Sequence, residues 1–193
     1  TEEIMEDSEY QGVRLSLDAY LDKTRIPLKI DISTGDVITP CEISFSYQLM
    51  FENRTIHLLA YPPETVLAEK LETILSRGEA NTRLRDFYDV YILQREDFVV
   101  TPDALCHALL ATCRKRGHED LLHTYASILD RVRQSDTMRT QWMKYQSDFD
   151  YAAGITWDTV LDTVETLCIK TLDDHAFGDE LPQEESQFEM HLL

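Results

Sequence analysis

Residues 55–78 read TIHLLAYPPETVLAEKLETILSRG, and the spacing of the apolar residues changes within this stretch. Up to Tyr61 the residues are typical of a β-strand that follows a turn at residues 52–54. Pro62-Pro63-Glu64 then predicts the start of a helix, and Gly78 predicts its end. An apolar stripe at helical spacing joins the two signals: Leu67, Leu71, Ile74 and Leu75. The chain therefore changes from strand to helix near residue 62.

Upstream of this stretch the apolar residues alternate with polar ones, which predicts half-buried β-strands. Three such segments lie at residues 13–17, 26–32 and 43–49, with a turn at Thr34-Gly35-Asp36. Together with the segment at 55–61 they make about four strands. Downstream, helical patterns follow at about 82–95, 102–116, 120–133, 136–147 and 157–171. The fold class is therefore α+β: a strand-rich front followed by a helical region.

The net charge of −18 comes mostly from the two ends of the chain. Residues 1–9 carry five acids and residues 173–193 carry seven, and neither stretch has a Lys or Arg. We expect residues 173–193 to form an acidic, flexible tail. No apolar run approaches the ~20 residues that a membrane helix needs. No CxxC pair occurs among the four cysteines, which indicates reduced thiols and a cytoplasmic protein.

Four polar residues stand at positions that packing alone does not explain. Asp31 lies on the polar face of its strand. There it is either a metal ligand or base that the strand holds in place, or a residue that simply faces solvent. Lys70 lies on the shoulder of the apolar stripe, unlike Glu72, which faces away from it. From there Lys70 either extends along the surface to solvent or points into a cleft. Asp86 and Asp89 share one face of a helix that is apolar on two sides, so both should be partly buried. The alternative to a functional role for these two acids is local ion pairing with Arg83 and Arg85 on the same helix.

The ordered segments around these residues resemble the AbiEii family of nucleotidyltransferase toxins, which act in abortive-infection and toxin–antitoxin systems against phage. The resemblance is carried by Tyr61-Pro62-Pro63-Glu64, Ala68-Glu69-Lys70-Leu71 and Asn81-Thr82-Arg83-Leu84-Arg85-Asp86-Phe87-Tyr88-Asp89. Upstream, residues 10–14 and 30–36 are also similar to the family. The similarity covers about residues 10–95, and it implies that the strands belong to a partial nucleotidyltransferase-like sheet.

The resemblance implies a transferase that uses Mg²⁺ and a nucleoside triphosphate. Asp31 would be a metal ligand and the base for the attacking hydroxyl. Lys70 would bind the triphosphate and Asp86 would complete the catalytic site, while Arg83 and Asp89 are further nucleotide-binding candidates. Phosphoryl transfer depends mainly on positioning and charge neutralisation, which these residue types can provide.

The family's first motif, Gly-Ser followed by Asp-x-Asp, has no match in this chain. None of the six glycines precedes a Ser, and the Asp-x-Asp at Asp148-Phe149-Asp150 lies in a helical region, where a solvated helix end explains it. We expect the motif to lie upstream of Thr1, or never to have been present. The chain alone is then expected to be inactive, and the alternative function is a non-catalytic nucleotidyltransferase-like interaction module.

Three divisions of the chain follow from these patterns. Residues 1–97 would form the nucleotidyltransferase-like core without its first motif, residues 98–172 a helical region, and residues 173–193 the tail. Seven basic residues gather within 111–145, where they could meet tRNA phosphates or form a solvated face: Arg114, Lys115, Arg116, Arg131, Arg133, Arg139 and Lys144. The partners that the resemblance implies are a nucleoside triphosphate, tRNA and a cognate antitoxin, and no membrane is expected.

Overall fold

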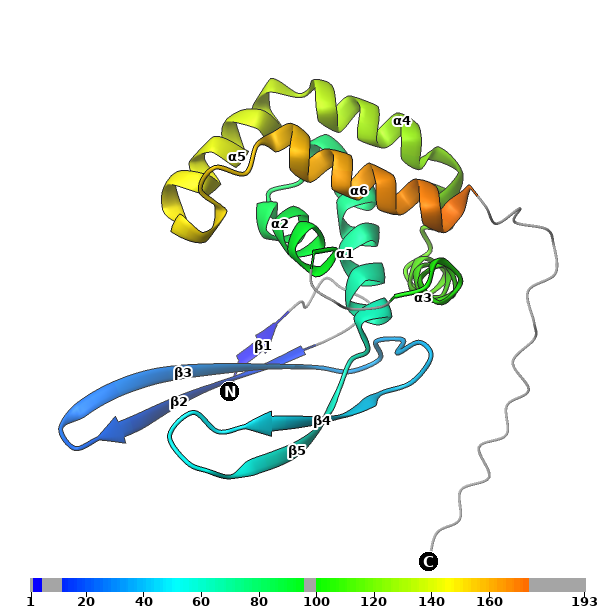
Figure 1. Ribbon diagram of the computed structural model, residues 1–193. Coiled ribbons are helices and arrows are strands. Elements are labelled where there is room, and N and C mark those ends of the chain that lie inside the picture. The colour runs from blue at the N-terminus through cyan, green and yellow to red at the C-terminus, as the bar shows by residue number, and fades with distance from the viewer. Residues whose placement is uncertain (1, 5–11, 96–99, 174–193) are drawn as a thin grey trace, which may run out of the picture.

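The computed structural model describes residues 2–4, 12–95 and 100–173. Two β-hairpins lie below a body of helices, and the second hairpin leads directly into the first helix (Figure 1). The predicted α+β class, with strands first and helices after, is confirmed. The predicted acidic tail lies outside the described residues, except for Asp173 at its start.

The strands form two separate antiparallel sheets. The first contains β1 (Glu2–Ile4), β2 (Gly12–Leu21) and β3 (Thr24–Ser33), and the second contains β4 (Ile43–Gln48) and β5 (Thr55–Ala60). A two-residue turn joins β2 to β3, and Asp22 adopts a φ of 53° there. Tight hairpin turns need a positive φ, and Asp accepts it more readily than most residues. The register places Arg14 of β2 opposite Asp31 of β3.

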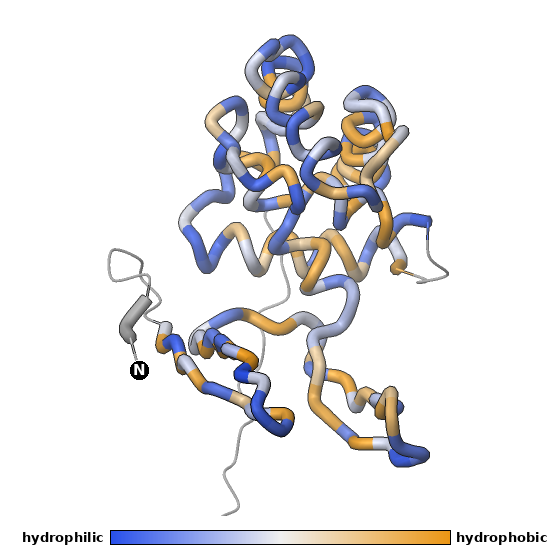
Figure 2. Tube along the Cα trace, turned by 90° about the vertical axis from the view of Figure 1, so that its left-hand side faces the viewer, coloured by the Kyte–Doolittle hydropathy of each residue, from blue (hydrophilic) through white to orange (hydrophobic). Residues whose placement is uncertain are grey.

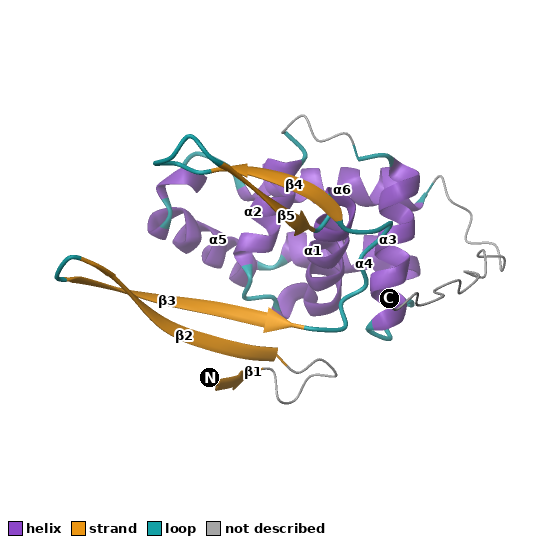
Figure 3. Ribbon diagram, turned by 90° about the horizontal axis from the view of Figure 1, so that it is seen from below, coloured by secondary structure: helices purple, strands orange, loops and turns teal. Residues whose placement is uncertain are grey.

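The apolar faces of both hairpins are open to solvent, although the alternation predicted that each strand would bury one face. Ile30 and Leu28 on β3 are 46% and 45% exposed, and Phe45 on β4 is 47% exposed. The two hairpins extend away from the helical body, and β2 and β3 lie apart from it when seen from below (Figure 3). Alternation fixes which side of a strand is apolar, but it does not supply the element that covers that side.

The six helices begin and end close to the predicted positions. They are α1 (Pro63–Arg77), α2 (Leu84–Leu93), α3 (Pro102–Lys115), α4 (Leu121–Gln134), α5 (Asp136–Asp148) and α6 (Trp157–Leu172). Thr101 and Thr156 cap α3 and α6 by accepting hydrogen bonds from the N–H groups of Ala104 and Thr159. Gly78 ends α1 with a φ of 49°, a conformation that favours glycine. Two short 3₁₀ turns follow α1 and α5, η1 (Gly78–Ala80) and η2 (Asp150–Ala152).

One hydrophobic core holds the helices together. Helix α1 packs against α2, α3 and α4, while α6 packs against α2, α3 and α4. Leu71 of α1, Phe87 of α2 and Val160 of α6 are fully buried within this core. The apolar residues accordingly gather inside the helical body, whereas apolar and polar residues alternate along the hairpins (Figure 2). Helices on both sides of the expected boundary at residue 97 contribute to the same core.

Within the described part of the chain, no helix is both long and apolar enough to cross a bilayer. All four cysteines are free, with Cys41 exposed and the other three buried. Cys106 and Cys113 both belong to α3 and lie on its buried side.

Candidate functional site

Lys70 lies between two carboxylates where α1 packs against α2. Its Nζ is 3.2 Å from Oδ1 of Asp86 and 2.6 Å from Oδ2 of Asp89. The side chains are 20%, 15% and 24% exposed, so all three groups are largely withdrawn from solvent. Lys70 therefore points into a polar site between α1 and α2. It does not extend along the surface to solvent, which was the other orientation that its sequence position allowed.

The start of α2 is set by Asn81, which is fully buried. Its Oδ1 accepts a hydrogen bond of 2.7 Å from the backbone N–H of Arg83, the residue that precedes the helix. Asp86 then falls in the first turn of α2, where a carboxylate is favoured by the helix dipole, and Asp89 follows one turn later. The spacing of three residues places both carboxylates on the face that meets Lys70.

The local pairing considered from sequence accounts for little of this arrangement. Arg85 reaches Asp89 only at 3.8 Å and its side chain is 78% exposed. Within the described residues Arg83 has no ion pair with Asp86. Oδ2 of Asp86 is buried and has no hydrogen-bond partner among the described residues. Buried acceptors are normally paired, so this oxygen is an exception.

Asp31 stands in a different environment. Its two carboxylate oxygens accept hydrogen bonds of 2.6 and 2.8 Å from Nε and Nη2 of Arg14 across the β2–β3 hairpin. These bonds lower the pKa of Asp31, so its carboxylate stays ionised. Among the residues that the structure describes, no hydrogen bond or ion pair joins Asp31 to Lys70, Asp86 or Asp89. The structure thus brings three of the predicted site residues together and holds Asp31 on the hairpin with Arg14.

The loop between β3 and β4 is hydrogen-bonded to the start of helix α1. Oδ2 of Asp36 accepts hydrogen bonds from Ser33 at 2.9 Å and from Tyr61 at 3.1 Å. Further along, Oγ1 of Thr65 in α1 both accepts from the N–H of Thr39 and donates to its carbonyl, each at 2.9 Å. The end of β3 is therefore tied to the first turn of the helix that carries Lys70.

A second charged cluster lies on α1 and was missed by the sequence reasoning. Glu72, expected to face away from the core, is only 2% exposed. Its carboxylate accepts from the guanidinium of Arg116, and its Oε1 lies 2.7 Å from Nδ1 of His118. Thr65 and Ala68 are also buried, so α1 is covered over a wider arc than its leucine stripe indicates. In the sequence, these two small residues beside the leucine stripe were the signal that a wider face of α1 is buried.

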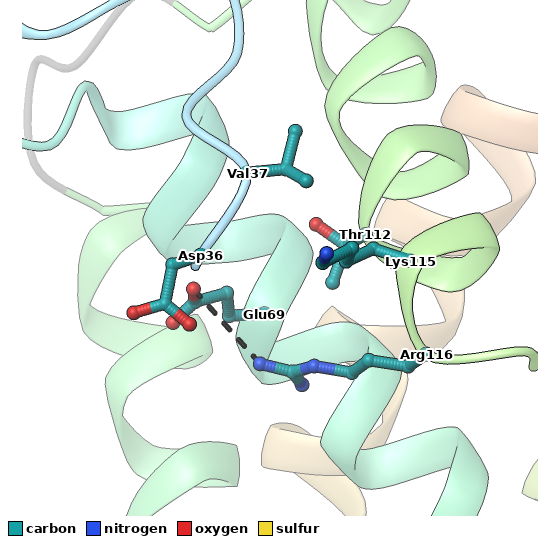
Figure 4. A pocket seen from close by; sticks show the side chains of 6 residues that line it. All are labelled: Asp36, Val37, Glu69, Thr112, Lys115 and Arg116. Atoms are coloured by element: carbon teal, nitrogen blue, oxygen red, sulfur yellow. Dashed lines mark ion pairs between the residues drawn. The ribbon is translucent and has the colours of Figure 1, made fainter. Parts of the chain in front are cut away.

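Arg116 also turns toward Glu69, with 3.9 Å between the charged groups. Figure 4 shows this pair with Asp36 beside it on the loop after β3, and with Thr112 and Lys115 on the opposite wall. Burial raises the pKa of Glu69, while the nearby Arg116 opposes that rise. The hollow at this place is small, and its charges hold α1, α3 and the loop together.

An open groove of about 620 Å³ lies next to the Lys70 site, between the start of α2 and helix α5. Asp86 forms part of its lining, which links the groove to the ion-paired cluster. From α2 and its approach come Thr82, Arg83, Leu84, Arg85 and Asp86, and from α5 and its end come Gln141, Lys144, Tyr145, Asp148 and Phe149.

The sequence resemblance implies a magnesium ion, which needs several oxygen ligands gathered around it. The described residues contain no group of three His, Cys, Asp or Glu side chains that could hold a metal. Asp86 and Asp89 face an ammonium group, and Asp31 faces a guanidinium. These carboxylates do not by themselves fit a metal centre.

The basic residues of 111–145 do not form a free cationic face. Arg116 pairs with Glu72, and the other pairs with acids are Arg114–Glu119, Arg131–Glu79, Arg133–Asp162, Arg133–Glu165 and Arg139–Asp158. Most of the positive charge counted from sequence is thus matched by acids of the same fold, five of them on α6 or in α1 and its following turn.

The fold and this site define an α+β protein with a lysine–carboxylate cluster between its first two helices. A family model described as "Nucleotidyl transferase AbiEii toxin, Type IV TA system" matches residues 1–163. The chain belongs to this family of nucleotidyltransferase toxins of type IV toxin–antitoxin systems. A toxin of such a system implies an antitoxin partner. No curated protein and no solved structure matches the chain.

Proposed function

We propose that this chain takes part in nucleotidyl transfer from a nucleoside triphosphate, with Lys70 contacting the triphosphate. The observation that supports this most is the position of Lys70, which is held by Asp86 and Asp89, and Asp86 also lines a groove. Structural lysines on helix shoulders usually reach solvent, whereas this one is directed to a site between two helices.

Each residue of the cluster has a proposed part. The Lys70 ammonium is a compact cation that can offset triphosphate charge. Asp86 and Asp89 hold that ammonium in one place, so less of its side-chain freedom is lost when a ligand binds. Arg83 lies at the start of α2 without an acidic partner in the described part of the chain, and we propose that it contacts the same nucleotide.

Asp31 is proposed as a metal ligand and as the base that accepts the proton of the attacking hydroxyl. The loop that ties the end of β3 to α1 supports a position near Lys70. Mg²⁺ dependence rests on family membership, and the described carboxylates would need further ligands to hold the ion. No step is therefore assigned to the metal.

The acceptor is proposed to be tRNA, as the resemblance implies. The ion pairs of residues 111–145 leave less free cationic surface for it than the sequence suggested. The alternative, a non-catalytic interaction module, is favoured by one observation: the apolar faces of both hairpins are exposed, as an unoccupied protein-binding surface would be.

The test of the Lys70 assignment compares triphosphates with monophosphates. Calorimetric titration of each nucleoside triphosphate should show binding weakened about tenfold or more in Lys70→Met, because a charge-assisted contact to phosphate is lost. Binding of the corresponding monophosphates should change little. Lys170→Met, on the exposed face of α6, is the matched control. Equal triphosphate affinities for Lys70→Met and the unmodified chain would overturn the assignment.

A further inference from the structure

A chain of aromatic contacts runs from the core to the rim of the groove between α2 and α5. Phe87 packs on Trp157, Trp157 on Trp142, and Trp142 stacks on Tyr145 with 5.4 Å between centroids and 23° between planes. Tyr145 in turn contacts Phe149 at 4.7 Å. Since Phe87 and Trp142 are fully buried, the outer rings are fixed by the core.

The outer end of this chain is exposed. Phe149 is 41% exposed, and it stacks at 5.3 Å on Tyr151, which is 51% exposed. Fixed aromatic rings at a surface lose little freedom when a planar ligand stacks on them. Phe149 lies between the two acids of the Asp148-Phe149-Asp150 segment. In this segment the exposed aromatic ring offers a stacking surface, which the two carboxylates do not.

The groove also carries a local excess of positive charge in an acidic protein. Arg83, Arg85 and Lys144 line it, against Asp86 and Asp148, and Asp86 already faces Lys70. Within the described chain, Arg83 and Lys144 form no ion pair. The one acid that pairs with Arg85 there is Asp89, at the long distance of 3.8 Å. These cations differ from the basic residues of α4, which are engaged by acids.

Two buried acceptors in the same groove have no donor within the part of the chain that the structure describes. Oδ2 of Asp86 and Oε1 of Gln141 are both withdrawn from solvent without a hydrogen-bond partner in the structure. Buried acceptors are normally satisfied, so these two oxygens are suited to receive N–H or O–H groups of a ligand. A nucleoside carries such groups on its base and its ribose.

From these features we infer that the α2–α5 groove binds a nucleotide unit. Its base stacks on Phe149, its phosphate meets Lys144 and Arg83, and its polar groups donate to Asp86 and Gln141. The inference rests on the proposed function, because it adds a second nucleotide contact surface beside Lys70. The unit is either the incoming nucleotide or the unpaired end of a nucleic-acid acceptor, since both present the same chemistry.

The experiment measures equilibrium binding of two probes to the full chain in EDTA, where no transfer occurs. One probe is each nucleoside triphosphate, and the other is a fluorescent unpaired RNA hexamer followed by anisotropy. Phe149→Ala and Lys144→Glu should each weaken binding of at least one probe by about fivefold or more, as expected for loss of one stacking or phosphate contact. A loss confined to the triphosphates assigns the groove to the incoming nucleotide, and a loss confined to the hexamer assigns it to the acceptor.

Matched controls separate this effect from general ones. Phe51→Ala removes a ring that is 94% exposed on the second hairpin, and Lys170→Glu reverses an exposed charge on α6. Both should leave affinities within about twofold, which is the scatter expected of surface changes outside a binding site. Phe149→Leu keeps the apolar contact with Tyr145 and carries the test if the alanine variant unfolds.

Unchanged affinities in the groove variants, or no detectable binding of either probe, would overturn the inference. Lys70→Met serves to distinguish the two proposals. If it weakens triphosphate binding while Phe149→Leu and Lys144→Glu weaken the binding of neither probe, the proposed function stands and the groove assignment fails.

Discussion

Lys70 is the residue that joins α1 to α2 through charge. Its ammonium contacts two carboxylates that lie on the same face of α2 and are mostly withdrawn from water. Two acids so placed repel each other unless a cation lies between them. Lys70 should therefore stabilise the fold in addition to its proposed contact with phosphate. The two effects can be measured separately.

Replacing Lys70 with Met should lower the free energy of unfolding by about 1–3 kcal/mol, because two partly buried carboxylates lose their donor. Thermal melts followed by circular dichroism measure this change. Adding Asp86→Asn and Asp89→Asn to the same variant should recover part of the loss, since the repulsion is removed. A Lys70→Met melting temperature equal to or above that of the unmodified chain would contradict the account.

The sequence located Lys70, Asp86 and Asp89 but not what surrounds them. Helical spacing placed the two acids on one face and predicted their partial burial, both of which the structure bears out. Glu72 was predicted to face away from the apolar stripe because of its position in the helical spacing. It is buried because Arg116 and His118, more than 40 residues later, satisfy its carboxylate. Periodicity within one helix carries no information about such distant partners.

At the scale of elements, the helices and hairpins differ in how their apolar residues are used. The helices bury theirs in a shared core, and the caps and glycine stops that bound them are local signals. That is why all six helices could be predicted within a few residues. Four of the five strands in the described residues were also located correctly, and β1 was missed. Alternation did not predict that the strands form two sheets or that their apolar faces stay open.

This difference predicts unequal costs for apolar substitutions. Leu71→Ala in α1 should cost about 2–5 kcal/mol, because the side chain is fully buried and leaves a cavity. Ile30→Thr on β3 should cost well under that, about 1 kcal/mol or less, because the side chain is 46% exposed. Urea denaturation of both variants gives the comparison. A loss for Ile30→Thr as large as that for Leu71→Ala would show that this strand face is covered in solution.

At the scale of the whole molecule, two buried thiols should make the free energy of unfolding depend on pH in the alkaline range. Burial raises the pKa of Cys113 and of Cys168 to about 12, above the ordinary 9.0. The folded state therefore keeps these protons while the unfolded chain releases them. Their contribution is fully present below pH 9 and is lost as the pH rises toward 12.

The free energy of unfolding should thus fall above pH 9, by up to about 1.4 kcal/mol per pH unit for each thiol. Chemical denaturation between pH 8 and 11 measures the slope. Cys113→Ala with Cys168→Ala should flatten it in part, since tyrosines whose pKa is also raised remain, such as Tyr125. Cys41→Ala, at an exposed thiol, should leave the slope unchanged. An equally steep slope in the double variant would contradict the role assigned to the buried thiols.

The central claim is that a family member with this Lys70 cluster transfers nucleotides, and that Asp31 takes part. The most direct measurement incubates the full-length natural protein with Mg²⁺, each labelled nucleoside triphosphate and total tRNA, and follows label in RNA. Lys70→Met and Asp31→Ala should abolish labelling. Asp18→Ala, which removes the same kind of cross-strand pair with Arg25 at 2.8 Å, should not. Labelling that persists at the unmodified rate in both site variants would contradict the account.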